Sequence, residues 1–163
     1  MADPVLLLRV LILIGVANSA PVLATRILGG RLSRPLDGGI RFFDGRPLFG
    51  ASKTIRGIVA ALAATSLSAP LLGFDWTTGA AVAAAALTGD LVSSFTKRRL
   101  GLAVHAQAIA LDQIPEVLLP LLLLRPALDL GFLDIVVVIA IFMLLEAVLS
   151  RILFRLGVRD RPY

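Results

Sequence analysis

The chain has 163 residues, of which 58% are hydrophobic, and its mean hydropathy is +0.92. Soluble domains are nearer to half apolar, so this composition predicts a membrane protein. The chain has no cysteine, which excludes a disulfide framework, a thiolate metal site and a cysteine nucleophile. A net charge of +5 fits either a nucleic-acid-binding protein or a membrane protein with basic cytoplasmic loops.

The first apolar stretch is interpreted as a retained membrane span. A signal peptide begins with a positively charged segment and ends at a cleavage site of small residues. Here Asp3 is the first charged residue and no basic residue precedes Arg9. Pro21 makes the preceding Ser19-Ala20 pair a poor cleavage site.

Five continuous apolar stretches reach, or nearly reach, the roughly 20 residues that a helix needs to cross a bilayer. The strands of a β-barrel would instead alternate in short segments. The sequence therefore predicts an all-α, polytopic bundle of about five transmembrane helices in a single domain, residues 1–163. The expected spans are 5–28, 54–74, 77–95, 112–127 and 132–156.

The positions of the basic residues predict the orientation of these spans. With five spans, fourteen of the sixteen Lys and Arg residues fall on one side, in loops 29–53 and 98–111, at the helix ends beside them or in the carboxyl-terminal tail. The positive-inside rule then places the amino terminus outside and the carboxyl terminus in the cytoplasm of a cell (inner) membrane protein. The basic charge is explained without nucleic acid.

The long loop between the first two spans is the first candidate for chemistry, because loops of this length are usually functional or disordered. It ends in Gly50-Ala51-Ser52-Lys53-Thr54. Ser52 or Thr54 can cap the next helix, whose free N–H groups would bind phosphate beside Lys53 and Arg56. A simple cap among membrane-surface arginines is the alternative. A P-loop is excluded, since no glycine directly precedes the lysine.

A second cluster lies at the end of the third span. Asp90, Ser93, Ser94 and Lys97 are spaced to share one helix face. A carboxylate within an apolar span is costly, so we expect Asp90 to be functional and to face the bundle interior. An ion pair with Lys97 or a loop arginine is the structural alternative.

The third span also carries small residues, which allow helices to approach closely. We therefore expect this span to lie inside the bundle, and such faces are also compatible with a homodimer. The small residues are Gly79, Ala83 and Ala86.

A third cluster, Asp112-Gln113-Ile114-Pro115-Glu116, opens the fourth span, where Asp112 could also be only a helix cap. On the predicted topology, several carboxylates gather with Lys and Arg at the cytoplasmic face. Magnesium takes one or two carboxylates together with substrate phosphates, so this arrangement suits a magnesium–nucleotide site. The carboxylates are Asp37, Asp44, Asp90, Asp112 and Glu116.

Taken in order, these motifs resemble the CDP-archaeol synthase family, which is related to the CDP-diacylglycerol synthases (phosphatidate cytidylyltransferases). The resemblance covers about residues 21–119 and implies a five-span enzyme in phospholipid biosynthesis. Such an enzyme uses CTP and Mg²⁺ to convert a membrane lipid phosphate into a CDP-lipid, with release of pyrophosphate. The motifs are Asp-Gly-Gly at 37–39, the run at 44–57, Gly-Asp-Leu at 89–91, Lys-Arg-Arg-Leu-Gly at 97–101 and Leu-Asp-Gln at 111–113.

The resemblance implies that Asp90 and Asp112 are catalytic metal ligands and that Lys53 contacts a substrate phosphate. Relatives are expected to carry a second acid three residues after Asp112, where this chain has Pro115; Glu116 is therefore the candidate replacement ligand. An ether-linked isoprenoid and an ester-linked acyl lipid phosphate both remain open as substrates. The expected substrate-binding residues are Asp37, Asp44, Ser52, Thr54, Arg56, Ser93, Lys97 and Arg98.

Three other functions compete with this one. A small transporter or ion-pathway protein would use Asp90 and Glu146 within the membrane, but it would not need the long charged loop. A CDP-alcohol phosphotransferase would carry an Asp-Gly-x-x-Ala-Arg run, which is absent. A structural subunit would leave the clustered acids unexplained. His105, the only histidine, is interpreted as a solvated loop residue.

Overall fold

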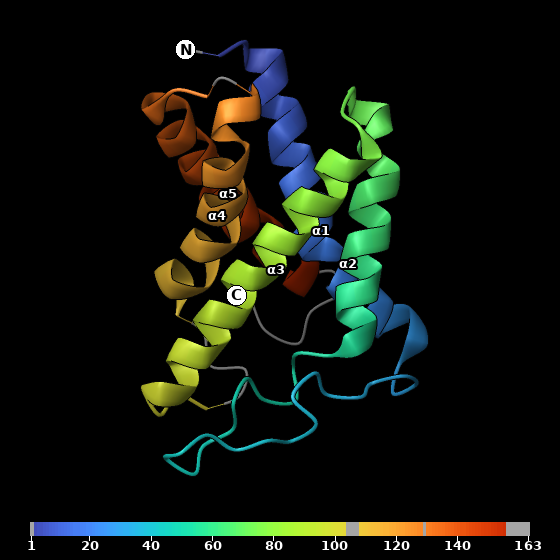
Figure 1. Cartoon of the computed structure of the whole chain (residues 1–163), viewed down its shortest axis with the longest axis vertical. Coiled ribbons are helices and arrows are strands. Elements are labelled where there is room, and N and C mark those ends of the chain that lie inside the picture. Colours follow the sequence, from blue (N-terminus) through green and yellow to red (C-terminus); the bar gives the residue numbers. More distant parts are fainter. Residues whose placement is uncertain (1, 104–107, 129, 156–163) are drawn as a thin grey trace.

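The computed structural model describes residues 2–103, 108–128 and 130–155, and over these residues the chain is a bundle of helices (Figure 1). Apart from two isolated β-bridges in the long loop, no strand occurs in these ranges. The all-α prediction is confirmed. The elements are α1 (Pro4–Leu28), α2 (Ile55–Ser68), the 3-10 turn η1 (Pro70–Leu72), α3 (Trp76–Arg99), α4 (Ile109–Leu128) and α5 (Phe132–Arg155).

Each predicted span contains a helix, with differences that have local causes. The second span is divided, because Pro70 lacks an N–H and ends α2 before η1. Helix α3 runs four residues beyond the predicted end, and its last turn holds three basic residues, which a helix carboxyl terminus favours. His105 and the tail residues Arg159 and Arg161 lie outside the described residues.

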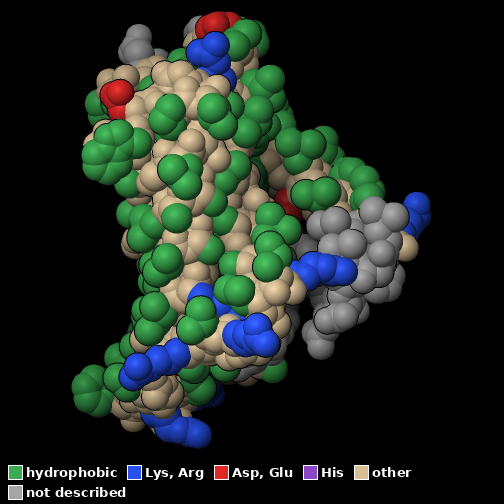
Figure 2. Space-filling model, turned by 90° about the vertical axis from the view of Figure 1, so that its right-hand side faces the viewer, with side chains coloured by type: hydrophobic (Ala, Val, Ile, Leu, Met, Phe, Trp, Pro, Cys, Tyr) green, Lys and Arg blue, Asp and Glu red, His purple; other side chains and the backbone are tan. Residues whose placement is uncertain are grey.

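Four of the described helical segments are long and apolar enough to cross a membrane: α1, α2 continued through η1, α3 and α5. Helix α4 differs, because it carries three charged residues, Asp112, Glu116 and Arg125. The hydrophobic side chains cover the helix flanks in Figure 2, whereas most Lys and Arg gather at the end that holds the long loop. This distribution is that of a membrane protein.

Helix α3 lies inside the bundle, as its small residues predicted. Gly79, Ala83 and Ala86 are buried. A Cβ at position 79 would lie 2.6 Å from the Thr65 carbonyl oxygen of α2. A Cβ at position 89 would lie 2.2 Å from the Pro115 carbonyl oxygen of α4. Glycine at these two positions therefore allows α3 to touch the backbones of both neighbours.

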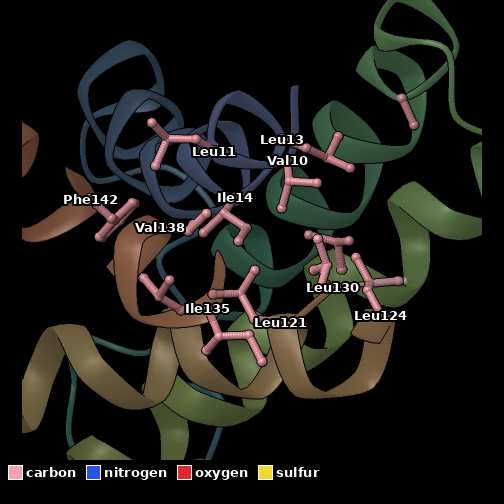
Figure 3. Packing of buried hydrophobic residues seen from close by; sticks show 13 residues of the cluster. Val10, Leu11, Leu13, Ile14, Leu121, Leu124, Leu130, Ile135, Val138 and Phe142 are labelled. Atoms are coloured by element: carbon pink, nitrogen blue, oxygen red, sulfur yellow. The ribbon is translucent and has the colours of Figure 1, made fainter. Parts of the chain in front are cut away.

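The apolar core joins α1, α4 and α5 (Figure 3). Leu13 and Ile14 of α1 and Leu121 of α4 are completely buried within it. In a bilayer such a core is held by close packing more than by exclusion of water. The polar side chains of the predicted site lie elsewhere, toward the end of the bundle that the long loop crosses.

Candidate functional site

A cavity of about 490 Å³ opens at the loop end of the bundle. All five helices and the end of the long loop contribute to it, so residues far apart in the sequence share one space. Its polar lining combines two cations with three acids. These are Lys53 from the loop, Arg56 from α2, Asp90 from α3, Glu116 from α4 and Glu146 from α5.

Lys53 and Asp90 form the central ion pair of this cavity. The Lys53 ammonium contacts both carboxylate oxygens of Asp90. The costly carboxylate within α3 is therefore paired, but with Lys53 and not with Lys97. Because Lys53 is the residue just before the helix cap of α2, this contact joins the end of the loop to α3.

Glu116 is the second acid of the cavity. Its carboxyl group lies beside that of Asp90, and close enough to Lys53 and Glu146 to interact electrostatically with both. The glycine at position 89 permits this contact, because it brings α3 against the backbone at Pro115 and Glu116. Two adjacent carboxyl groups are stable together only with a proton or a cation between them.

The start of α2 forms the basic wall of the cavity. Thr54, and not Ser52, is the helix cap: its hydroxyl accepts a hydrogen bond from the Gly57 N–H at 3.3 Å. Ser52 is exposed and lines the cavity. Arg56 donates to the carbonyl oxygens of Gly29, at 2.6 Å, and Arg31. It thereby ties the end of α1 to α2 while its side chain borders the cavity.

Asp112 lies outside the cavity lining, in a second ion pair. Its carboxylate accepts from Lys97 at 2.6 Å and from the Ala108 N–H at 3.0 Å. Arg98 is buried and donates to the Ala103 carbonyl oxygen at 3.0 Å. Ser93 is also buried and donates to the carbonyl oxygen one turn earlier in α3. These contacts shape the end of α3 and the start of α4.

Asp37 organises the long loop from within. One of its carboxylate oxygens accepts from the N–H groups of Phe49 and Gly50, and the other from Gly39, each at 3.0 Å. Burial opposes ionisation of this carboxyl, but the three backbone donors outweigh it and hold the pKa of Asp37 below its usual value. The side chain therefore closes the loop on itself, outside the cavity lining.

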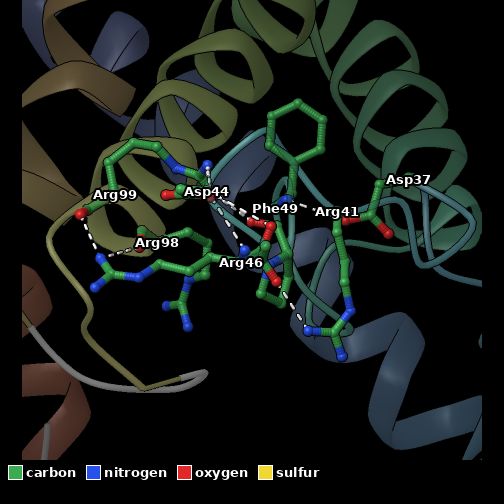
Figure 4. A network of polar contacts seen from close by, with 9 residues as sticks. Asp37, Arg41, Asp44, Arg46, Phe49, Arg98 and Arg99 are labelled. Carbon is green, nitrogen blue, oxygen red and sulfur yellow. Dashed lines mark hydrogen bonds and ion pairs between the residues drawn. The ribbon is translucent and has the colours of Figure 1, made fainter.

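Asp44 and Arg99 fasten the middle of the loop to the end of α3 (Figure 4). Their ion pair measures 2.6 Å, and Arg99 also donates to the Pro47 carbonyl oxygen at 2.6 Å. The Arg99 guanidinium lies over the rings of Phe42 and Phe95, at 4.7 and 5.0 Å from their centroids. Asp44 is thus placed in a docking contact and not in the cavity.

The structure divides the predicted site residues into two groups. Lys53, Asp90 and Glu116 meet in the cavity, together with Ser52, Thr54 and Arg56. The sequence provided no role at this site for Glu146, although an acid within an apolar span was a signal for one. The predicted site residues outside the cavity lining are Asp37, Asp44, Ser93, Lys97, Arg98 and Asp112.

The donor set fits a magnesium ion that is shared with a nucleotide. Among the described residues, no three acidic or histidine side chains are arranged to hold a metal by themselves. Magnesium requires only one or two carboxylates when phosphates and water complete its shell. The adjacent carboxyl groups of Asp90 and Glu116 meet that need.

Comparison with known proteins identifies the family of this chain. The family model described as CarS-like, CDP-archaeol synthase, matches residues 4–75 and 67–163. The chain is 40% identical over 112 residues to a CDP-archaeol synthase of Pyrobaculum calidifontis, with 66% of each chain covered. It is 31% identical over 163 residues to one of Methanococcus aeolicus, covering 89% of this chain and 88% of the relative.

A solved structure shares the fold. It is reported as an intramembrane enzyme for archaeal membrane lipid biosynthesis, with a TM-score of 0.75 and 34% identity. The match covers 87% of this chain and 90% of that one. The chain therefore belongs to the CarS-like family of CDP-archaeol synthases.

Proposed function

We propose that this protein transfers the cytidylyl group of CTP to a membrane lipid phosphate, forming a CDP-lipid and pyrophosphate. The observation that carries the proposal is the joining of Lys53, Asp90 and Glu116, from three separate segments, in one cavity of a membrane bundle. Family membership supports the same activity, since the relatives are CDP-archaeol synthases.

In the proposed reaction, a lipid phosphate oxygen attacks the α-phosphorus of CTP. A new phosphorus–oxygen bond forms, the bond from the α-phosphorus to the β-phosphate oxygen breaks, and pyrophosphate leaves with the electron pair. A phosphomonoester has a second pKa of about 6, so the nucleophile is mostly dianionic at neutral pH and needs no general base. Catalysis then rests on positioning and charge neutralisation.

Lys53 is the residue that we assign to charge neutralisation. Its ammonium holds Asp90 in the structure and would turn toward a nucleotide phosphate when one enters. The N–H groups at the start of α2 and the guanidinium of Arg56 border the same cavity and favour anions there. Ser52 would add a hydroxyl contact from the exposed end of the loop.

Asp90 and Glu116 would hold Mg²⁺, with Asp112, one helical turn earlier on α4, as the third candidate ligand. The ion would supply charge neutralisation for the triphosphate and the departing pyrophosphate. For the residues outside the cavity lining we propose a positioning role. Asp37 and Asp44 shape the loop that carries Lys53, while Ser93, Lys97 and Arg98 shape the end of α3.

We infer that the cavity faces the cytoplasm, where CTP is present, because the basic residues gather at the loop end of the bundle. The archaeal relatives favour an ether-linked isoprenoid glycerol phosphate as the lipid substrate. An ester-linked phosphatidate presents the same phosphate group, so the two lipids must be compared directly.

The test uses purified protein in nanodiscs supplied with CTP labelled in its α-phosphate, magnesium, and one or the other lipid phosphate. We expect the label to enter a lipid product and unlabelled pyrophosphate to be released in equal amount. CTP labelled in its γ-phosphate is the matched control and should leave the lipid unlabelled. Absence of labelled lipid with both substrates would exclude the proposed reaction.

A further inference from the structure

The middle of the long loop forms a hairpin, which we call the tip hairpin, residues 40–48. Backbone hydrogen bonds join Phe42 to Arg46 at 2.8 Å and Leu48 to Ile40 at 3.0 Å. The Gly45 N–H closes the turn by donating to the Phe42 carbonyl oxygen at 2.9 Å. The tip is therefore a defined structure and not a loose segment.

The tip hairpin exposes an apolar surface that nothing in the described chain covers. The Phe43 side chain is 100% exposed and Ile40 is 61% exposed. Phe43 packs only edge-to-face on Phe42, with ring centroids 5.0 Å apart. An aromatic side chain that projects from an ordered turn stays exposed to water unless it packs against another molecule. Such an exposed apolar group often marks an interaction site.

The hairpin is held against the last turns of α3. Phe42 packs on Phe95 of α3 with centroids 5.3 Å apart, and Arg46 donates to the carbonyl oxygen of Arg99 at 2.6 Å. Helix α3 has 24 residues and a length of about 36 Å, longer than a hydrocarbon core of about 30 Å. A helix of this length is expected to reach the headgroups with its last turn, and the hairpin that contacts this turn is expected at the same level.

The charges around the tip favour an anionic surface. Arg41 and Arg46 are exposed on the hairpin. Its only acid, Asp44, is paired with Arg99 of α3. Basic side chains beside a membrane attract anionic lipid headgroups, and aromatic rings are enriched at the level of those headgroups. In Figure 2 the Lys and Arg side chains gather at this end of the molecule.

We propose that the tip hairpin docks on anionic lipid headgroups of the adjacent leaflet, with Phe43 inserted among them. The lipid surface is the occupant that fits an exposed aromatic ring, flanking arginines and a position at headgroup level. This proposal does not depend on the reaction proposed above, because it concerns the outside of the loop and not the cavity.

The test places a single tryptophan at the tip. Trp76 is the only tryptophan of the chain, so Phe43→Trp combined with Trp76→Phe reports on position 43 alone. The protein is placed in nanodiscs of neutral or anionic phospholipid that carry bromine at a shallow or a deep acyl position. Leu144→Trp in the same background is the matched control, since Leu144 is exposed near the middle of α5.

We expect Phe43→Trp to emit at shorter wavelength in anionic than in neutral nanodiscs, and shallow bromine to quench it about twofold while deep bromine quenches it little. Leu144→Trp should show the opposite depth preference. Ile40→Trp provides a second reporter on the same hairpin. Free quenching of both tip tryptophans by aqueous iodide, without quenching by either brominated lipid, would overturn the proposal. That result would leave a protein partner as the occupant.

Discussion

Two lysine–aspartate pairs stand near the same end of α3, and they differ in what surrounds them. Lys53–Asp90 and Lys97–Asp112 are similarly exposed, with side chains at 22% and 25% in the first pair and at 13% and 24% in the second. Asp90 also has a second carboxyl group beside it in a cavity. Asp112 instead has a backbone donor on its other oxygen.

The difference shows how two ion pairs of the same residue types can serve different purposes. Asp112 lies outside the cavity lining, between Lys97 of α3 and the backbone at the start of α4, so we expect its removal chiefly to affect how these two helix ends are positioned. A carboxylate beside another carboxyl group is destabilised by the repulsion between them, and a bound cation relieves this repulsion. We therefore expect the first pair to be the centre of the chemistry and the second to support it.

The largest expected effect tests the first pair. Asp90→Asn removes a proposed metal ligand and the charge that Lys53 pairs with, so turnover of CTP should fall by about 100-fold or more. The measurement is formation of labelled CDP-lipid at saturating CTP and magnesium. Elution as a monodisperse peak and an unchanged helical circular dichroism spectrum would show that the variant is folded. A wild-type rate would remove Asp90 from the mechanism.

The close contact between α3 and α4 that brings Asp90 and Glu116 together can be broken without changing either acid. Gly89→Ala would place a Cβ 2.2 Å from the Pro115 carbonyl oxygen, so α3 and α4 must separate. We expect a lower thermal midpoint and a loss of turnover of about tenfold, as positioning effects produce.

Gly15→Ala is the matched control for this change, because a Cβ at that position of α1 would meet no atom within 4 Å outside the local backbone of its own helix. It should leave turnover unchanged and preserve the thermal midpoint. If both glycine variants behave alike, then helix propensity and not the α3–α4 contact explains the result.

The second pair should give a smaller loss. Asp112→Asn keeps an acceptor for the Ala108 N–H but loses the ionic contact with Lys97, so we expect about tenfold slower turnover, in the range of residues that orient ligands. The same CDP-lipid assay, run beside Asp90→Asn, measures the ratio. Equal losses in the two variants would mean that both pairs act as one metal site, and the contrast between them would be lost.

The smallest expected effect concerns the stability of the long loop and how that stability changes with pH. Because the folded pKa of Asp37 is lowered, its ionised form stabilises the loop fully above the unfolded pKa of about 3.9 and loses that contribution as pH falls through the folded value. Asp37→Asn should reduce the pH dependence of loop stability and lower the free energy of opening the loop by about 1.5–3 kcal/mol at neutral pH. Hydrogen exchange of residues 29–53 between pH 3 and pH 7 measures both.

Asp44→Asn is the comparison for that experiment, since Asp44 is more exposed and pairs with a single arginine. Its effect on exchange should be smaller than that of Asp37→Asn. An equal effect would show that docking to α3, and not the internal bonds of Asp37, holds the loop.

The amino-acid sequence by itself determined the class of the molecule. Long apolar stretches can bury their backbone polar groups in lipid only as helices, so the five helices and their approximate limits followed from composition and spacing. The pattern of Gly79, Ala83 and Ala86 likewise placed α3 inside the bundle. The three polar clusters were visible because charged residues are rare within such stretches.

Only the tertiary structure decided which charges meet. The family resemblance suggested Asp90 and Asp112 as metal ligands, with Glu116 as the candidate replacement for a missing acid. In the structure Asp90 lies beside Lys53 and Glu116, and Asp112 forms an ion pair with Lys97. Spacing along one helix predicts which side chains share a face, but the partner of each depends on how closely two helices pack and in which register. Here a glycine contact between α3 and α4 sets that register, and no local pattern encodes it.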